Sequence, residues 1–293
     1  MALAIHPLTP VFGAVVTGFS IRDGVADSDF AEIERAFNEH GVLVFPDQPV
    51  NDEQQIAFSE RFGPLEATLT GAVGAASKLA RISNLMPDGS RKDPEGQLAL
   101  FTRANLYWHT DSSFKPVPAM ASLLSARILP KAGGDTEFAS TRAAFEALPP
   151  ETQARLERMI AVHWIVTSRL KVSPEAVTDA QRRDMPPVQQ ALVRSNPVTG
   201  RKSLLIGSHV TRIEGMDDDA ALALNEELVQ LATLPQHVYR HEWRANDIVM
   251  WDNRAVLHRG HPYDEAGDDR LLIRTTVAGG GPTVVDGRIV DAA

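Results

Sequence analysis

Hydrophobic residues at the start of the chain follow a pattern that predicts two helices separated by one strand. Apolar residues recur at three- and four-residue intervals over 30–37, which is the spacing of one helix face, and Gly41 can end that helix. The continuous apolar run 42–45 is typical of a short buried strand. A second helix is expected over 51–62, because Asn51 or Asp52 can cap its first turn.

From position 79 onward, short segments with the pattern of strands dominate the chain. The expected strands cover 79–83, 119–129, 136–139, 161–167, 191–195, 203–207, 237–243, 247–251 and 271–277. A hairpin connection is expected at 196–200, and helices at 141–160 and 217–231. The expected fold is mainly β with helices (α+β): a sandwich or jelly-roll barrel with peripheral helices, in one domain over 1–293.

Composition restricts the possible chemistry and partners. The chain has 293 residues and no cysteine, which excludes disulfides, thiolate zinc sites and a cysteine nucleophile. A net charge of −9 argues against nucleic acid as a partner. Residues 1–10 lack the pattern of a secretory signal, and no apolar run is long enough to span a membrane. We therefore expect a cytoplasmic protein without a nucleic-acid or membrane partner, and we also expect it to be a homo-oligomer.

His109 and Asp111 are the first candidates for metal ligands. Residues two apart on an extended segment point the same way, so one imidazole and one carboxylate can reach the same ion. The alternative is a loop histidine that is hydrogen-bonded to an aspartate. His258, at the end of an apolar run, can supply a third ligand, although a lone histidine is more often structural. Two histidines and a carboxylate form the facial triad of non-haem Fe(II) oxygenases.

Arg270 and Arg274 lie four residues apart on an expected strand and therefore share one face of it. Arginine binds carboxylates through two parallel donors, so the pair can hold two carboxylates, one from a cosubstrate and one from a substrate. The alternative is a solvated strand face, but Leu272 shares this face and indicates that it is partly buried. His209 follows an apolar strand and is expected to face a pocket.

These motifs, in this order, resemble the taurine and 2,4-dichlorophenoxyacetate dioxygenase family. The matching segments are 41–46, 54–58, 61–64, 82–84, Asn105, 108–114, 133–138, 249–254, 257–260 and the two arginines. The resemblance implies a double-stranded β-helix, or jelly roll, decorated with helices. It also implies Fe(II) as the metal, with 2-oxoglutarate and O2 as cosubstrates.

The resemblance assigns roles to individual residues. It implies that His109, Asp111 and His258 bind the iron. Thr136 and Arg270 would hold the distal carboxylate of 2-oxoglutarate. The anionic group of the substrate would meet Arg274, and Asn105 would line the pocket.

Segments 135–138, 185–188 and 201–209 resemble the phenoxyacetate branch more than the taurine branch. The expected substrate is therefore an aryloxyalkanoate, hydroxylated so that it breaks down to a phenol and a 2-oxo acid. A sulfonate or alkyl sulfate is the alternative within the family. A non-oxidative cupin-like metalloenzyme and a non-catalytic binding barrel are alternatives from other classes. The variable loops 66–77, 84–104 and 168–187 are expected to shape the substrate pocket.

Overall fold

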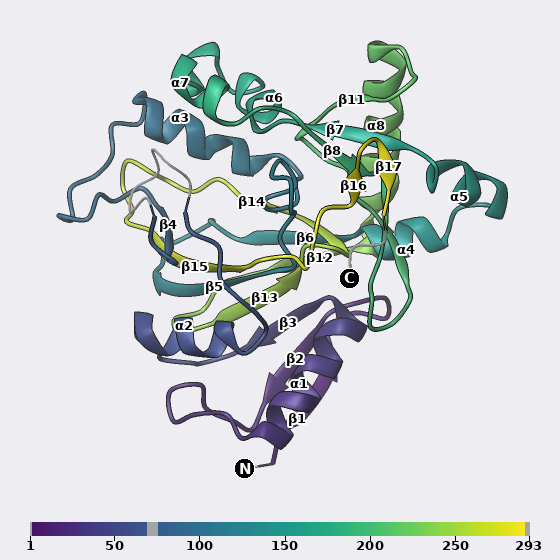
Figure 1. The fold of residues 1–293 in the computed structure, drawn as a ribbon. Helices are drawn as coiled ribbons and strands as arrows, with labels where there is room; N and C mark the ends of the chain where they lie inside the picture. Colours follow the sequence, from purple (N-terminus) through teal and green to yellow (C-terminus); the bar gives the residue numbers. More distant parts are fainter. Residues whose placement is uncertain (1, 69–75, 291–293) are drawn as a thin grey trace.

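The computed structural model describes residues 2–68 and 76–290, which form antiparallel sheets with helices around them (Figure 1). The largest sheet has the strand order β1-β2-β3-β13-β5-β15-β4, and only its β2–β3 pair is parallel. Its strands are β1 (Ala4–Pro7), β2 (Ala14–Thr17), β3 (Val42–Phe45), β4 (Ala80–Ser83), β5 (Ala121–Ile128), β13 (Ile248–Asp252) and β15 (Leu271–Val277).

Helices α1 (Asp27–His40) and α2 (Asp52–Glu60) cover one face of this sheet. Successive side chains of a strand point to opposite faces of the sheet. Leu43 and Phe45 therefore pack against these helices, while Val42 and Val44 project from the opposite face into a second core cluster. Both helices and the intervening strand were expected from the sequence. The α2 N-terminus is closed by Asn51 and Gln54, which bond to each other's backbone N–H groups.

A second sheet faces the other side of the large one. It contains β12 (Val238–His241), β6 (Thr136–Ser140) and β14 (Val256–Gly260), with β6 in the centre. Phe138 of β6 packs against Trp251 of β13 with ring centroids 5.5 Å apart, and both residues are fully buried. The predicted class, mainly β with surrounding helices, is confirmed.

The rest of the chain forms smaller sheets and helices beside these two layers. Strands β9 (Val193–Ser195) and β10 (Lys202–Leu204) form the predicted hairpin. The other strands are β7 (Ile160–His163), β8 (Val188–Ala191), β11 (Val210–Ile213), β16 (Val284–Val285) and β17 (Arg288–Ile289), and the helices are α4 (Thr141–Glu146), α5 (Pro150–Leu156) and α8 (Asp218–Ala232). The helix expected over 141–160 is thus two helices, interrupted where Pro149 and Pro150 begin the second.

Two predicted elements were wrong in type, and both lie beside the site. The strand expected over 161–167 ends at His163, and α6 (Ile165–Leu170) follows it. The region expected to be a loop over 84–104 contains α3 (Gln97–Arg103). Together with α7 (Asp179–Asp184), these helices gather at one end of the molecule (Figure 1).

Of the predicted pocket loop 66–77, positions 69–75 lie outside the described residues. Within the described residues, every helix is too short or too polar to cross a bilayer.

Candidate active site

His109 and His258 are brought together by direct backbone pairing. The N–H of His109 donates to the carbonyl of His258 at 3.1 Å, and the N–H of His258 donates back at 2.9 Å. Residues opposite each other in an antiparallel pair project to the same side, so the two imidazoles lie together with centroids 4.1 Å apart. This backbone bridge thus places side by side two histidines that are 149 positions apart in the chain.

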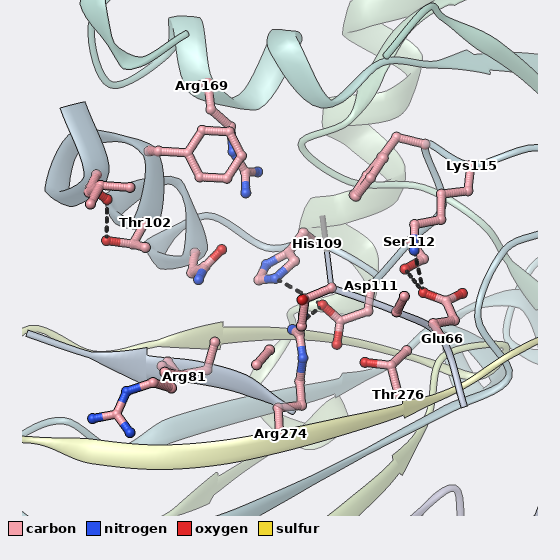
Figure 2. A pocket seen from close by; sticks show the side chains of 18 of the residues that line it. Glu66, Arg81, Thr102, His109, Asp111, Ser112, Lys115, Arg169, Arg274 and Thr276 are labelled. Atoms are coloured by element: carbon pink, nitrogen blue, oxygen red, sulfur yellow. Dashed lines mark hydrogen bonds and ion pairs between the residues drawn. The ribbon is translucent and has the colours of Figure 1, made fainter. Parts of the chain in front are cut away.

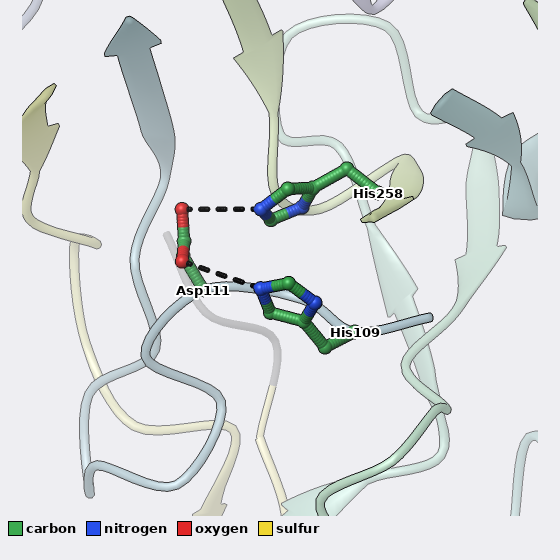
Figure 3. Close-up of side chains that lie close together, drawn as sticks. All are labelled: His109, Asp111 and His258. Atoms are coloured by element: carbon green, nitrogen blue, oxygen red, sulfur yellow. Dashed lines mark ion pairs between the residues drawn. The ribbon is translucent and has the colours of Figure 1, made fainter. Parts of the chain in front are cut away.

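Asp111 completes a buried group of three possible metal ligands (Figure 3). Its Oδ1 lies 4.0 Å from Nε2 of His109, and its Oδ2 lies 3.7 Å from Nε2 of His258. Among the described residues, these three are the one set of histidine and acidic side chains whose ligand atoms are close enough to bind the same metal ion. The structure thus brings together all three ligands that the sequence predicted.

The electrostatics of these groups suit a divalent metal. Burial lowers the pKa of His109 and His258, which favours the neutral imidazoles that metals require. Nδ1 of His109 lies 2.8 Å from the carbonyl of Tyr107, so this nitrogen carries the proton and Nε2 is free to bind a metal. Burial alone would raise the pKa of Asp111, but Arg274 and the two histidines lower it below its ordinary value.

Ser122 and Asn253 orient the carboxylate, and the sequence analysis did not single out either residue. Ser122 Oγ donates to Oδ2 of Asp111 at 2.7 Å, and Asn253 Nδ2 donates to Ser122 Oγ at 3.0 Å. The side-chain oxygen of Asn253 accepts from the backbone N–H of Asp111 at 3.2 Å and from Nε1 of Trp251 at 3.0 Å. Two imidazoles, one carboxylate and this support fit a three-ligand Fe(II) site with open positions.

An inner cavity lies beside His258 and contains both residues predicted to bind 2-oxoglutarate. Arg270 and Thr136 line it, together with Leu124 and Trp251. Arg270 is buried, and its Nη2 donates to the carbonyl of Gly134 at 2.8 Å, but it forms no ion pair within the described part of the chain. A buried guanidinium that is not matched by a carboxylate suits the distal carboxylate of a dicarboxylic acid.

Two local features maintain this end of the inner cavity. A Cβ on Gly134, whose φ is +74°, would lie 3.0 Å from Nε of Arg270, so glycine keeps space for the guanidinium. Nε1 of Trp243 donates to Oγ1 of Thr136 at 3.1 Å. Because this bond uses an acceptor position of the hydroxyl, the Thr136 proton remains available for an anion. Trp243 was not identified from the sequence, where it only ended an expected strand.

An outer cavity lies on the other side of His109 (Figure 2). Phe101 from α3 and Phe114 provide aromatic walls, and Arg169 from α6 reaches into it. Arg274 lines both cavities and donates to Oδ1 of Asp111 at 2.6 Å. Figure 2 shows Arg169 and Arg274 approaching the metal ligands from opposite sides. Arg169 carried no recognisable signal in the sequence, because its segment was expected to be a strand followed by a loop.

Asn105 and His209 both lie where the sequence analysis expected them, at the pocket. Asn105 lines the inner and the outer cavity, and His209 lines the outer one. His209 is buried and packs edge-to-face on Phe114, with centroids 5.0 Å apart. Its ring nitrogens contact Ser113 Oγ at 3.1 Å and Arg169 Nη1 at 3.4 Å.

Comparison with known proteins agrees with this geometry. The family described as taurine catabolism dioxygenase TauD, TfdA family matches residues 4–276. An alpha-ketoglutarate-dependent 2,4-dichlorophenoxyacetate dioxygenase of Cupriavidus pinatubonensis is 41% identical over 94% of this chain and 98% of its own. An (S)-phenoxypropionate/alpha-ketoglutarate-dioxygenase of Sphingobium herbicidovorans is 37% identical over 95% of this chain and 96% of its own.

A solved structure is also similar along the full length. The crystal structure of AAD-2 in complex with Mn(II) and N-oxalylglycine has a TM-score of 0.90 and 40% sequence identity, covering 98% of this chain and 100% of AAD-2. The site and these similarities define a non-haem Fe(II) enzyme that uses 2-oxoglutarate and O2. The chain belongs to the TauD, TfdA family of dioxygenases. The alternatives of a non-oxidative metalloenzyme and a non-catalytic barrel are therefore excluded.

Proposed function

We propose that this dioxygenase hydroxylates an aryloxyalkanoate on the carbon that joins the ether oxygen to the carboxylate. The observation that carries the proposal is the outer cavity, where aromatic Phe101 and Phe114 and cationic Arg169 surround one side of the metal ligands. Such walls suit a molecule with an aromatic ring at one end and an anion at the other. The relatives named for phenoxyacetate and phenoxypropionate support the same substrate class.

The residues have distinct parts in this proposal. His109, Asp111 and His258 hold Fe(II), which together with 2-oxoglutarate supplies the oxidising chemistry from O2, with succinate and CO2 as coproducts. Arg270 and the free proton of Thr136 bind the distal carboxylate of 2-oxoglutarate. Arg274 is proposed to meet the substrate anion; it already binds Asp111, so that role remains a prediction.

In the overall reaction, succinate and the hydroxylated substrate each receive one oxygen atom of O2. One atom of O2 enters succinate, and the other becomes a hydroxyl on the substrate carbon. That carbon then carries both a hydroxyl and an aryl ether oxygen, and such a hemiacetal breaks its ether bond to give a phenol and a 2-oxo acid. The chain contributes by orienting the substrate and by excluding water from a site whose three ligands are all buried.

We also propose that the seven-stranded sheet and the β12-β6-β14 sheet form a double-stranded β-helix. Their packing on each other through the cluster around Phe138 and Trp251 supports this arrangement. The single domain over 1–293, the cytoplasmic location and the homo-oligomer remain predictions.

The proposal is tested with purified, Fe(II)-loaded protein and a panel of anionic substrates. We expect phenoxyacetate or phenoxypropionate to release phenol and succinate in equal amounts, and only when 2-oxoglutarate is present. The methyl esters, which lack the anion, should react much more slowly. Turnover of taurine or an alkyl sulfate, without turnover of any aryloxy acid, would instead assign the chain to the sulfonate or sulfate alternative. An anaerobic absorption band of the Fe(II)–2-oxoglutarate chelate provides the control for cosubstrate binding.

A further inference from the structure

Arg169 is a buried cation that forms no ion pair within the described residues. It is 6% exposed, and its Nη1 donates to Ser168 Oγ at 2.8 Å, while its Nε has no hydrogen-bond partner among the described residues. The guanidinium lies over the ring of Phe101 at 4.4 Å. Burial lowers the pKa of Arg169 to about 9, and the nearby carboxylate of Asp111 offsets only part of this effect.

The other cations around the outer cavity are already engaged or directed elsewhere. Arg274 binds Asp111 at 2.6 Å, and Lys115 binds Glu66 at 2.6 Å. Lys78 pairs with Glu60, and Lys92 donates to the carbonyl of Ser83. The guanidinium of Arg81 points away from the metal ligands (Figure 2). Arg169 is therefore the cation beside the site that most requires an incoming anion.

His209 holds Arg169 through a chain of hydrogen bonds with a defined direction. A guanidinium only donates, so Nε2 of His209 accepts from Arg169 at 3.4 Å. A ring nitrogen that accepts a hydrogen bond carries no proton, so the proton of the His209 ring is on Nδ1. Nδ1 then donates to Ser113 Oγ at 3.1 Å, and Ser113 donates to Nδ1 of His163 at 3.1 Å.

This arrangement fixes the plane and the position of the guanidinium before a substrate arrives. Phe101 covers one face of the guanidinium, and His209 accepts from one of its donors. Donors that remain free can face the cavity, which is the geometry that a carboxylate binds with two parallel bonds. A preorganised donor fork increases affinity because less freedom is lost on binding.

We propose that Arg169 binds the carboxylate of the primary substrate, and that His209 acts as its positioning residue rather than as a substrate ligand. This inference rests on the proposed function for the substrate class. It adds an anion-binding residue on α6, an element outside both main sheets, to the role proposed for Arg274 in the same cavity. Specificity for acids over esters would then originate in the outer cavity.

The test measures binding as well as turnover, with Arg169→Gln and, as a control, Arg212→Gln at an exposed arginine that lines neither cavity. Protein loaded with Mn(II) and 2-oxoglutarate is dialysed against radiolabelled phenoxyacetate, and Kd is compared with wild type. Losing one partner of a buried charge pair weakens binding by about 30-fold or more, which we expect for Arg169→Gln. Arg212→Gln should change Kd by less than about threefold, and Kd for 2-oxoglutarate should remain unchanged in both variants.

The outcomes separate this inference from the proposed function. If wild-type protein does not bind phenoxyacetate, the proposed substrate class fails. If wild type binds and Arg169→Gln binds equally well, only the role of Arg169 fails. The same conclusion follows if Arg274→Gln abolishes acid-over-ester preference while Arg169→Gln retains it. Should Arg169→Gln not fold, Arg169→Lys keeps the charge but loses the two-pronged donor, and unchanged affinity in that variant would overturn the proposal.

Discussion

Asn253 accepts a hydrogen bond from the backbone N–H of Asp111, 142 positions earlier in the chain. The same side chain donates to Ser122, which in turn donates to the carboxylate of Asp111. The metal ligand is thus held through both its backbone and its side chain by one asparagine. This relationship makes Asn253 a supporting residue that can be tested separately from the ligands.

We predict that Asn253→Ala lowers both metal affinity and stability. The substitution leaves buried groups of Asp111 and Trp251 without a partner, at a cost of about 1–3 kcal/mol for each. Loss of a residue that supports a metal ligand typically lowers metal affinity about 10- to 100-fold. Calorimetric titration with Mn(II) and thermal unfolding measure the two effects.

Asn38→Ala is the matched control for this prediction. Asn38 is also a buried asparagine, and its side-chain oxygen accepts from Arg254 and Asn196 at 3.1 Å, but it touches no metal ligand. It should lose stability and keep wild-type metal affinity. Equal loss of metal affinity in both variants would show that Asn253 acts only through general stability.

Asp111→Ala is predicted to abolish turnover. The metal would lose one of three protein ligands, and Arg274 would lose its ion-pair partner. Succinate release and Mn(II) binding should both fall to background, whereas His6→Gln, at an exposed histidine, should match wild type. Near-normal turnover by iron-loaded Asp111→Ala protein would contradict the ligand assignment.

Arg270→Ala is predicted to raise the KM for 2-oxoglutarate by about 30-fold or more, because a carboxylate would lose its buried partner. The KM for the primary substrate should change far less, because Arg270 lines only the inner cavity. Initial rates of succinate formation at varied concentrations of each substrate provide both constants. The reverse pattern would mean that Arg270 and Arg274 exchange their roles.

Trp243→Phe is predicted to raise the KM for 2-oxoglutarate several-fold with little change in kcat. Without the indole N–H, the hydroxyl of Thr136 is free to rotate and is no longer directed at the cosubstrate. Thr136→Val should raise KM at least as much, and adding Trp243→Phe to it should have no further effect. An additive effect in the double variant would mean that Trp243 acts by packing instead.

His209→Leu is predicted to weaken phenoxyacetate binding, while His209→Gln retains most of it. Glutamine can accept from Arg169 and donate to Ser113, whereas leucine can do neither. The split should be visible as a higher KM for acids, with the KM for methyl esters unchanged. Equal behaviour of the two variants would argue for a packing role against Phe114.

The metal ligands and the two arginines could be predicted from the sequence for two reasons. Some of them lie close together in the chain, and their motifs follow the same order as in the family that the chain resembles. His109 and Asp111 share a short segment. Arg270 immediately precedes β15 and Arg274 lies within it, and both line the inner cavity. The bridge between His109 and His258 could not be predicted from spacing, because backbone pairing across 149 positions depends on the whole fold.

Residues on α6 and α3 could not be predicted for a different reason. Ile165, Val166 and Thr167 are β-branched and favour a strand, yet Ile165 and Val166 are buried in a helix against Val177. Tertiary packing thus overrides local preference in α6, and this change of element carries Arg169 into the cavity. Prolines and glycines precede α3, and they predicted a loop. The short helix that carries Phe101 was therefore missed.

The two cavities differ in which parts of the fold supply their walls. Strands of the two main sheets provide Thr136, Leu124 and Trp251 around the cosubstrate, whereas α6 and α7 provide Arg169 and Gln181 to the outer cavity alone. Mutations in α6 and α7 can therefore change which molecule is admitted without altering the oxidative machinery. Directed evolution toward new acids should accumulate substitutions in α6 and α7, while the sheet residues tolerate few.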